Sequence, residues 1–262
     1  MSEPVVLVST DASGVATLTL NRPAVHNAFD DALIAELTAS LRRVAADTAV
    51  RVVVLTGSGQ SFSAGGDLNW MRRMAQYSDA ENRADAMALA GLLRTLDELA
   101  KPTVARVNGA AFAGGLGLVS CCDIAVAAEE AVFSLSEARL GLVPATIGPY
   151  VVAAIGPRAA RRYFLTAERF SASEAQRIGL VHEVAPRAAL DAAVDKIVAT
   201  LLEAAPGAQA RAKRLIAEVE SRPLSDTTMA LTAQVIADAR ASAEGREGLA
   251  AFFDKRKPSW RA

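Results

Sequence analysis

The sequence has few of the residues that mark several protein classes. Its 262 residues include two cysteines and two histidines, and only 5% are aromatic. The cysteines are the neighbours Cys121 and Cys122, and adjacent residues rarely reach the geometry of a disulfide. A disulfide scaffold is therefore excluded, and we expect a reducing compartment. His26 and His182 stand alone without the spacing of metal ligands, so the sequence predicts no metal site.

An excess of charge of one sign is also missing. The 28 Lys and Arg against 29 Asp and Glu leave a net charge of −1, which provides no global attraction for nucleic acid or a membrane surface. No basic segment precedes an apolar run at the start, and the uncharged stretch over residues 107–122 is too short and glycine-rich to span a bilayer. We predict a cytoplasmic protein with neither nucleic acid nor membrane as partner, in which local structure binds any anionic ligand.

Hydrophobic residues are abundant, at 52% of the chain, and they follow both strand and helix patterns. Residues 15–20 alternate as in a strand and form a predicted hairpin with residues 5–9. Residues 52–56 form an apolar run typical of a strand buried on both faces, and residues 103–107 are predicted to form another buried strand. Residues 30–46 have the spacing of an amphipathic helix. Strands that alternate with helices predict a mostly parallel α/β core, in which ligands bind at the carboxyl ends of strands.

Two glycine-rich segments each follow an expected strand. Residues 62–68 are Phe-Ser-Ala-Gly-Gly-Asp-Leu, a turn that leaves backbone amides uncovered. Residues 109–117 are Gly-Ala-Ala-Phe-Ala-Gly-Gly-Leu-Gly and open a helix whose first N–H groups have no partner, which suits negative charge. Each segment alone is typical of a tight turn or of close helix packing. The two together, after neighbouring strands, predict a pocket for an oxyanion.

Further motifs occur along nearly the whole chain in a fixed order. They are Asn21-Arg-Pro23, Asn27-Ala-Phe29, residues 62–68, Lys101-Pro102, residues 107–123, Ser136-Glu-Ala-Arg-Leu-Gly141, Gly179-Leu-Val181 and Phe252-Phe-Asp-Lys-Arg-Lys257. As a set they resemble the crotonase, or enoyl-CoA hydratase/isomerase, family. The resemblance implies an α/β fold with a crotonase-like spiral core of ββα units over residues 1–200. It also implies a helical region over residues 201–262 that assembles homotrimers, often paired into hexamers.

The resemblance implies an acyl-CoA thioester as substrate, so coenzyme A is part of the substrate and no separate cofactor is expected. The backbone amides of Gly66 and Gly114 match the family's two oxyanion donors, and donors of this kind stabilise a transition state by about 3 kcal/mol each. Glu137 matches a catalytic glutamate, and its apolar neighbours favour a raised pKa; a helix-initiating glutamate is the alternative. The residues expected along the coenzyme A, the last two toward a neighbouring subunit, are Val25, Ala64, Asp67, Leu68, Phe252 and Lys255.

Gly117 departs from the two-glutamate pattern of the family's hydratases, because it stands where they carry their other catalytic glutamate. A single carboxylate suits the transfer of a proton between two carbons, as in a Δ3,Δ2-enoyl-CoA isomerase. However, residues 111–123, 135–144 and 159–170 are similar to the bacterial branch assigned to methylglutaconyl-CoA hydration in leucine breakdown, which also lacks that glutamate. We therefore expect an enoyl-CoA hydratase with Glu137 as acid and base. The alternatives are the isomerase and a non-catalytic CoA-binding oligomer partner.

Two assignments stay open at the level of sequence. Trp70, Met71, Met74 and residues 145–149 are candidates to line the acyl pocket, but a stripe of Met and Trp at helical spacing is more often part of a core. Lys255 lies in a basic run that is equally typical of a solvated surface.

Overall fold

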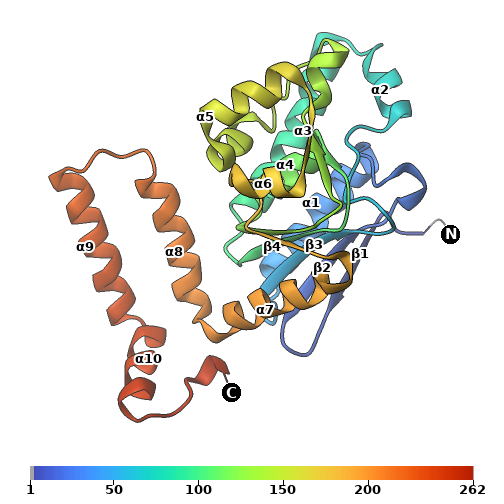
Figure 1. The fold of residues 1–262 in the computed structure, drawn as a ribbon. Helices are drawn as coiled ribbons and strands as arrows, with labels where there is room; N and C mark the ends of the chain where they lie inside the picture. Colours follow the sequence, from blue (N-terminus) through green and yellow to red (C-terminus); the bar gives the residue numbers. More distant parts are fainter. Residues whose placement is uncertain (1–2, 262) are drawn as a thin grey trace.

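A six-stranded sheet forms the base of the computed structural model, which describes residues 3–261 (Figure 1). Its first two strands make an antiparallel hairpin, and the other neighbouring pairs are parallel. In sheet order the strands are β1 (Val6–Thr10), β2 (Val15–Leu20), β3 (Val52–Gly57), β4 (Thr103–Val107), β6 (Ile124–Ala128) and β9 (Glu183–Ala185). The hairpin and the two buried strands that the sequence predicts are confirmed.

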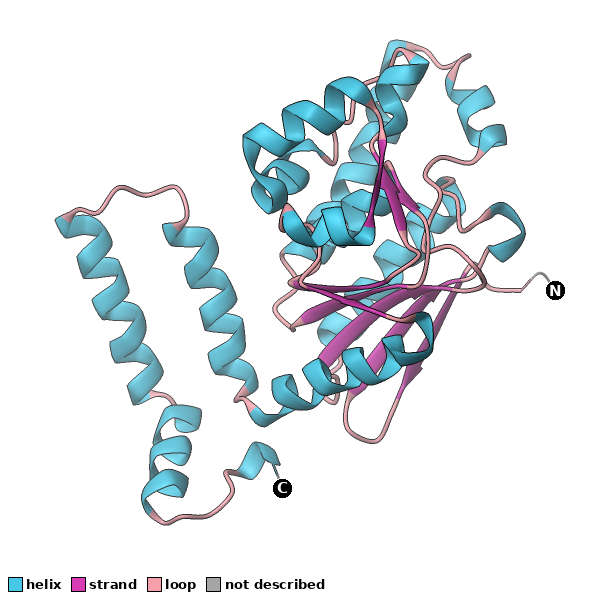
Figure 2. Ribbon diagram, in the orientation of Figure 1, coloured by secondary structure: helices cyan, strands magenta, loops and turns pink. Residues whose placement is uncertain are grey.

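A three-stranded sheet crosses above the first (Figure 2). Its strands, in order, are β5 (Ala111–Phe112), β7 (Val132–Ser134) and β8 (Arg169–Ser171). The chain leaves the large sheet, adds a strand to the small one and enters a helix. It does so as β4, β5 and α4 (Gly114–Cys121), and again as β6, β7 and α5 (Gly148–Thr166). These repeated ββα passages confirm the predicted spiral α/β fold.

Helices cover both faces of the large sheet, and the side chains of β3 show why. Val53 and Leu55 belong to the main core, to which α1 (Asp31–Ala46) and α3 (Asp79–Asp97) also contribute. Val52 and Val54 pack instead with residues of α7 (Leu190–Glu203). Because successive side chains point to opposite faces of a strand, a strand that is apolar throughout requires a cover on each face.

Local signals set the limits of the helices around the sheet. The Asp30 carboxylate accepts the Leu33 N–H at 2.9 Å and caps α1, whose apolar stripe then faces the core. Ser78 and Glu81 form a capping box at the start of α3. The remaining elements of this part are α2 (Leu68–Met74), α6 (Ala172–Arg177) and the short 3₁₀ helices η1 (Pro23–Val25), η2 (Ser136–Leu140) and η3 (Arg187–Ala189).

The last three α-helices project away from the sheets (Figure 1). They are α8 (Pro206–Val219), α9 (Asp226–Ala241) and α10 (Ala243–Phe253), and η4 (Ser259–Arg261) follows them. The predicted limit at residue 200 falls inside α7, which packs under the sheet, so the projecting part begins at Pro206. No helix in residues 3–261 is long and apolar enough to cross a membrane.

Candidate active site

Three loop segments meet above the carboxyl ends of β2, β3 and β4, where the sequence predicts a ligand site. The Phe29 N–H donates to the Gly65 carbonyl at 2.7 Å, and the Phe29 carbonyl accepts the Asp67 N–H at 2.8 Å. Similarly, the Ser63 N–H donates to the Ala110 carbonyl at 3.0 Å, and the Ser63 carbonyl accepts the Phe112 N–H at 2.9 Å. This ladder holds the two glycine-rich turns in a fixed relation to each other.

Two buried asparagines support the ladder from below. The side-chain amide of Asn27 donates to the carbonyls of Ser58 and Ser61 at 2.9 and 2.8 Å. Asn108 donates to the Gly59 carbonyl at 3.0 Å and accepts the Gly57 N–H at 3.3 Å. Both asparagines belong to the motifs found in the sequence, and the structure assigns them to loop geometry rather than to chemistry.

The backbone N–H of Gly66 has no hydrogen-bond partner within residues 3–261. The preceding Gly65 has φ +90°, a left-handed conformation that favours glycine, and this turns the chain so that its neighbour's amide stays unpaired. A Cβ on Gly66 would lie 3.3 Å from Cγ of Met71, so the turn packs closely on α2. The uncovered amide agrees with the oxyanion donor expected here.

Gly114 is the first residue of α4, so no helical carbonyl four residues earlier can accept its N–H. This N–H has no hydrogen-bond partner in the described chain. Its N-cap, Ala113, has φ 46° and ψ −117°, which L-residues rarely adopt. A Cβ on Gly114 would lie 3.2 Å from the ring of Phe29, the residue that pairs with the Gly65 to Asp67 turn. The two unpaired amides therefore belong to segments that flank the same phenylalanine.

The strand that precedes Glu137 lies beside the strand that precedes α4, because β5 pairs in parallel with β7. Phe112 is paired with Ser134, and the Ala113 N–H donates to the Ser134 carbonyl at 2.9 Å. Glu137 is the second residue of η2 and lies in its first turn, as the alternative of a helix-initiating glutamate expects. Its Oε2 atom is buried and has no hydrogen-bond partner within residues 3–261. Burial raises the pKa of this carboxyl, and a contact with its own backbone N–H opposes the shift in part.

Ile147 fills the space beside Gly117, the position at which the family's hydratases carry a second glutamate. A Cβ on Gly117 would lie 2.3 Å from Cγ2 and 3.0 Å from Cβ of Ile147, which is itself buried. Ile147 belongs to the segment 145–149 that the sequence suggests for the acyl pocket. Trp70 is buried as well, and its indole N–H donates to Asp85 at 3.0 Å, so at least part of that stripe is core.

A groove of about 450 Å³ runs beside the first glycine turn. It brings together four of the residues predicted to contact coenzyme A, with Gly66 at its side; Gly114 and Glu137 are not among its lining residues. Leu68 is 70% exposed and Val25 is 41% exposed, which are high values for apolar side chains. The complete lining is Ala24, Val25, His26, Ala28, Ala64, Gly66, Asp67, Leu68, Asn69 and Arg72.

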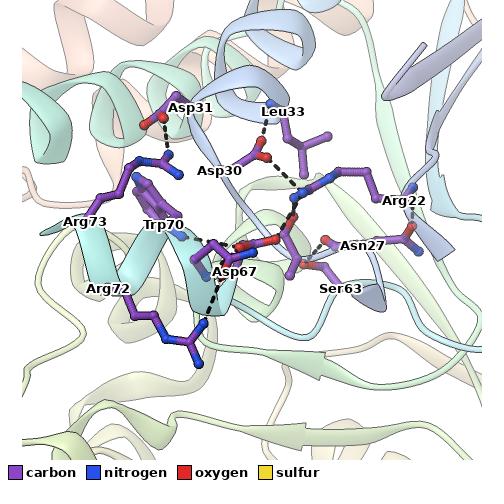
Figure 3. Close-up of polar contacts among 12 residues, drawn as sticks. Arg22, Asn27, Asp30, Asp31, Leu33, Ser63, Asp67, Trp70, Arg72 and Arg73 are labelled. Carbon is purple, nitrogen blue, oxygen red and sulfur yellow. Dashed lines mark hydrogen bonds and ion pairs between the residues drawn. The ribbon is translucent and has the colours of Figure 1, made fainter. Parts of the chain in front are cut away.

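The carboxylate of Asp67 is engaged inside the protein (Figure 3). It accepts the Arg22 guanidinium at 3.0 Å and caps α2 by accepting the Asn69 and Trp70 N–H groups at 2.8 and 3.3 Å. Burial alone raises the pKa of this carboxyl, but these donors outweigh burial and lower it. Arg22 also pairs with Asp30 at 2.8 Å, so the arginine joins the caps of α1 and α2. A ligand in the groove would meet the Asp67 backbone rather than its carboxylate.

Phe252 and Lys255 lie elsewhere, on α10 and just after it. This helix packs on α8 and α9, and the structure does not bring either residue to the groove within one chain. Phe252 is 76% exposed, as its neighbour Phe253 is at 74%. Their contact with a neighbouring subunit stays a prediction.

His26 and Arg72 are among the lining residues that the sequence analysis did not place at this site. Arg72 lies four residues after Leu68, and residues four apart share a face of a helix. That spacing is a signal in the sequence that could have placed Arg72 beside the groove. The ion pair of the adjacent Arg73 with Asp31 follows only from the position of the helix.

Comparison with known proteins agrees with this geometry. The sequence profile described as enoyl-CoA hydratase/isomerase matches residues 10–262. The chain belongs to this family. It is 44% identical to an enoyl-CoA hydratase from Shewanella pealeana, and the match covers 98% of this chain and 96% of the other. The crystal structure of that protein superposes on this structure with a TM-score of 0.95. The resemblance stated from the motifs and the prediction of a crotonase-like enzyme are thereby confirmed.

Two further members of the family are similar over nearly their whole length. The chain is 33% identical to crotonyl-CoA hydratase of Syntrophomonas wolfei, with 94% of each chain covered. It is 32% identical to 2,3-dehydroadipyl-CoA hydratase of Escherichia coli, with 97% of this chain and 98% of the other covered.

Proposed function

We propose that this member of the enoyl-CoA hydratase/isomerase family adds water to a 2-enoyl-CoA thioester, with Glu137 as acid and base. The observation that carries the proposal is the Glu137 carboxyl, whose buried Oε2 has no partner among the described residues and whose pKa is raised by burial. A carboxyl in this condition exchanges protons more readily near neutral pH than an ordinary exposed one. The Gly66 and Gly114 amides are the proposed oxyanion donors.

The proposed reaction has two proton transfers. Water attacks the β carbon while the Glu137 carboxylate removes one of its protons, and the electron pair of the double bond moves through the α carbon onto the thioester oxygen. The unpaired N–H groups of Gly66 and Gly114 stabilise the resulting enolate, because they are already fixed by the ladder and do not reorganise. Glu137 then returns the proton to the α carbon, which restores the carboxylate and the carbonyl.

A single carboxylate performs both transfers in this scheme, because Ile147 closes the place of a second one at Gly117. For the substrate we propose a branched 2-enoyl-CoA of the methylglutaconyl type. The similarity of residues 111–123, 135–144 and 159–170 to that bacterial branch supports this substrate. Two of the relatives are named as hydratases of crotonyl-CoA and of 2,3-dehydroadipyl-CoA, which are 2-enoyl thioesters as well.

The alternative is a Δ3,Δ2-enoyl-CoA isomerase, and the closed site at Gly117 is the observation that favours it, since isomerisation needs one carboxylate. Purified protein is mixed with 3-methylglutaconyl-CoA, and the absorbance of the conjugated thioester is followed. Hydration removes this absorbance. If the absorbance persists and a 3-enoyl-CoA instead acquires it, the activity is that of an isomerase. Binding of both thioesters without turnover would support a non-catalytic partner.

We also propose that the chain assembles as a homotrimer or a dimer of trimers through its C-terminal helices. Several apolar side chains on this part of the chain are exposed, and surfaces of this kind mark sites of association. They are Ile216, Leu224, Met229, Ile236, Leu249, Phe252 and Phe253. Light scattering of the purified chain tests the proposal, and a monomer at micromolar concentration would contradict it. The cytoplasmic location stays a prediction.

A further inference from the structure

The groove beside Gly66 has one permanent positive charge among its lining residues. Most of its lining is small or apolar, and its acid, Asp67, is ion-paired with Arg22 at 3.0 Å. His26 points a ring nitrogen at the Ser61 hydroxyl at 3.1 Å. Arg72 is the only lysine or arginine in the lining. Because Arg22 neutralises the charge of Asp67, the Arg72 guanidinium is the charge that a ligand in the groove would meet.

Arg72 differs from its neighbour Arg73 in what it contacts. Arg73 is ion-paired with Asp31 on α1 and points toward that helix (Figure 3). Arg72 points away from it and makes one hydrogen bond, to the neutral side-chain carbonyl of Asn69 at 3.0 Å. No carboxylate lies within 4.0 Å of Arg72 in the described chain. A guanidinium carries five N–H donors, so most of those on Arg72 remain free for a ligand.

We propose that Arg72 binds a phosphate of the coenzyme A moiety. This rests on the proposed function only in taking an acyl-CoA thioester as the ligand. The planar donor fork of arginine matches phosphate oxygens and forms charge-assisted hydrogen bonds with them. An acyl-CoA whose carbonyl oxygen lies at the Gly66 amide has its phosphates beyond the pantetheine arm, and Gly66, Leu68 and Arg72 all line this one groove. The apolar lining suits the arm, and the cation suits the anionic end.

Calorimetry with coenzyme A itself tests the proposal on the wild type and on two matched variants. Arg72→Gln removes the proposed contact, and Arg73→Gln removes an equal charge from the next residue, which does not line the groove. We expect Arg72→Gln to raise the Kd about tenfold, which corresponds to about 1.4 kcal/mol. Arg73→Gln is expected to leave the Kd unchanged. Arg72→Lys, which keeps the charge without the fork, is expected to lie between the wild type and Arg72→Gln.

Two truncated ligands identify which phosphate is bound. Pantetheine lacks all phosphates, so the wild type and Arg72→Gln should bind it equally. Dephospho-CoA lacks only the 3′-phosphate: equal binding by the two proteins assigns Arg72 to that group, and a persisting difference assigns it to the diphosphate. The proposal is overturned if Arg72→Gln binds coenzyme A as the wild type does, if both arginine variants weaken binding alike, or if binding of pantetheine weakens by the same factor.

Turnover separates this inference from the proposed function. With an enoyl-CoA substrate, the effect of Arg72→Gln should fall on KM rather than on kcat, because a remote phosphate contact contributes equally to the ground state and the transition state. If the wild type hydrates the substrate and Arg72→Gln is unaffected, only the inference fails. If the wild type binds coenzyme A in an Arg72-dependent way but turns over no enoyl-CoA, only the proposed function fails. A wild type that does not bind coenzyme A overturns both.

Discussion

The Cγ2 atom of Ile147 lies 2.3 Å from the position that a Cβ on Gly117 would occupy. These residues come from α4 and from the turn before α5, and the isoleucine fills the place where a second catalytic carboxylate would begin. Replacing Gly117 alone cannot create a second carboxylate site, because the new side chain would first have to displace Ile147.

The first prediction concerns this contact. Gly117→Ala should destabilise the protein by about 2 kcal/mol, because overpacking a close-packed core forces its neighbours to shift. In an Ile147→Ala background the same substitution should cost much less, since the obstructing methyl group is gone. Urea unfolding of the two single variants and the double variant measures the coupling. Additive effects would show that the two residues do not compete for space.

The second prediction concerns Glu137. Glu137→Gln should lower kcat by about 100-fold or more, because the amide cannot exchange the proton. The raised pKa also predicts the direction in which the stability of the fold changes with pH. The folded state holds the Glu137 proton more tightly than the unfolded state, so ionisation destabilises the fold as pH rises through the folded-state pKa. The variant should therefore be at least as stable as the wild type at pH 7, with the difference disappearing below pH 4.

Unfolding curves for wild type and Glu137→Gln across this pH range test the second part of that prediction. A variant that is less stable at pH 7 than at pH 4 relative to the wild type would show that the carboxylate is stabilised in the folded state. Retained turnover would remove Glu137 from the proposed mechanism.

The third prediction concerns the strained residue before the second oxyanion amide. Ala113 has φ 46° and ψ −117°, and such a conformation costs a non-glycine residue about 1–3 kcal/mol. Ala113→Gly should therefore stabilise the protein by about 1 kcal/mol after the entropy of the more flexible unfolded chain is subtracted. As a control, Ala110→Gly, whose φ is not positive, should destabilise it. Thermal unfolding gives both signs, and equal effects would contradict the assigned strain.

The fourth prediction concerns the pair of Arg22 and Asp67. Asp67→Ala should destabilise the protein by about 3 kcal/mol, because it removes the cap of α2 and leaves part of the Arg22 charge uncompensated. The lowered pKa means that the ionised carboxylate stabilises the fold above its ordinary value of 3.8 and that this stabilisation is lost as pH falls below it. Asp67→Asn should lack this acid-dependent part, which unfolding between pH 2 and pH 5 measures. Parallel curves for both proteins would contradict it.

Much of the fold was predictable because its signals are local. Strand β3 is apolar at each of residues 52–55, and this pattern predicts a strand that is covered on both faces before any of its packing partners is known. The two glycine turns were also predictable, since an unpaired amide follows from a left-handed glycine or from the first turn of a helix. The family's motifs then predicted that Gly66, Gly114 and Glu137 form one site.

Other features could not be predicted from the pattern of residues. Asp67 lies in a glycine turn that suits ligand binding, but its carboxylate forms an ion pair with Arg22, which lies 45 residues earlier in the chain. Arg72 and Arg73 are chemically identical neighbours, and only the direction of α2 relative to α1 pairs one of them with Asp31 and leaves the other at the groove.

The sequence by itself therefore determined the α/β spiral and the two glycine turns, because these depend on residues close together in the chain, and the family's motifs predicted Gly66, Gly114 and Glu137 as the catalytic residues. The tertiary structure alone decided that Ile147 closes the place of a second carboxylate and that Arg72 is the free cation of the groove's lining. Both depend on which distant side chains reach the same point in space, and that is set by the packing of α5 on α4 and of α2 beside α1.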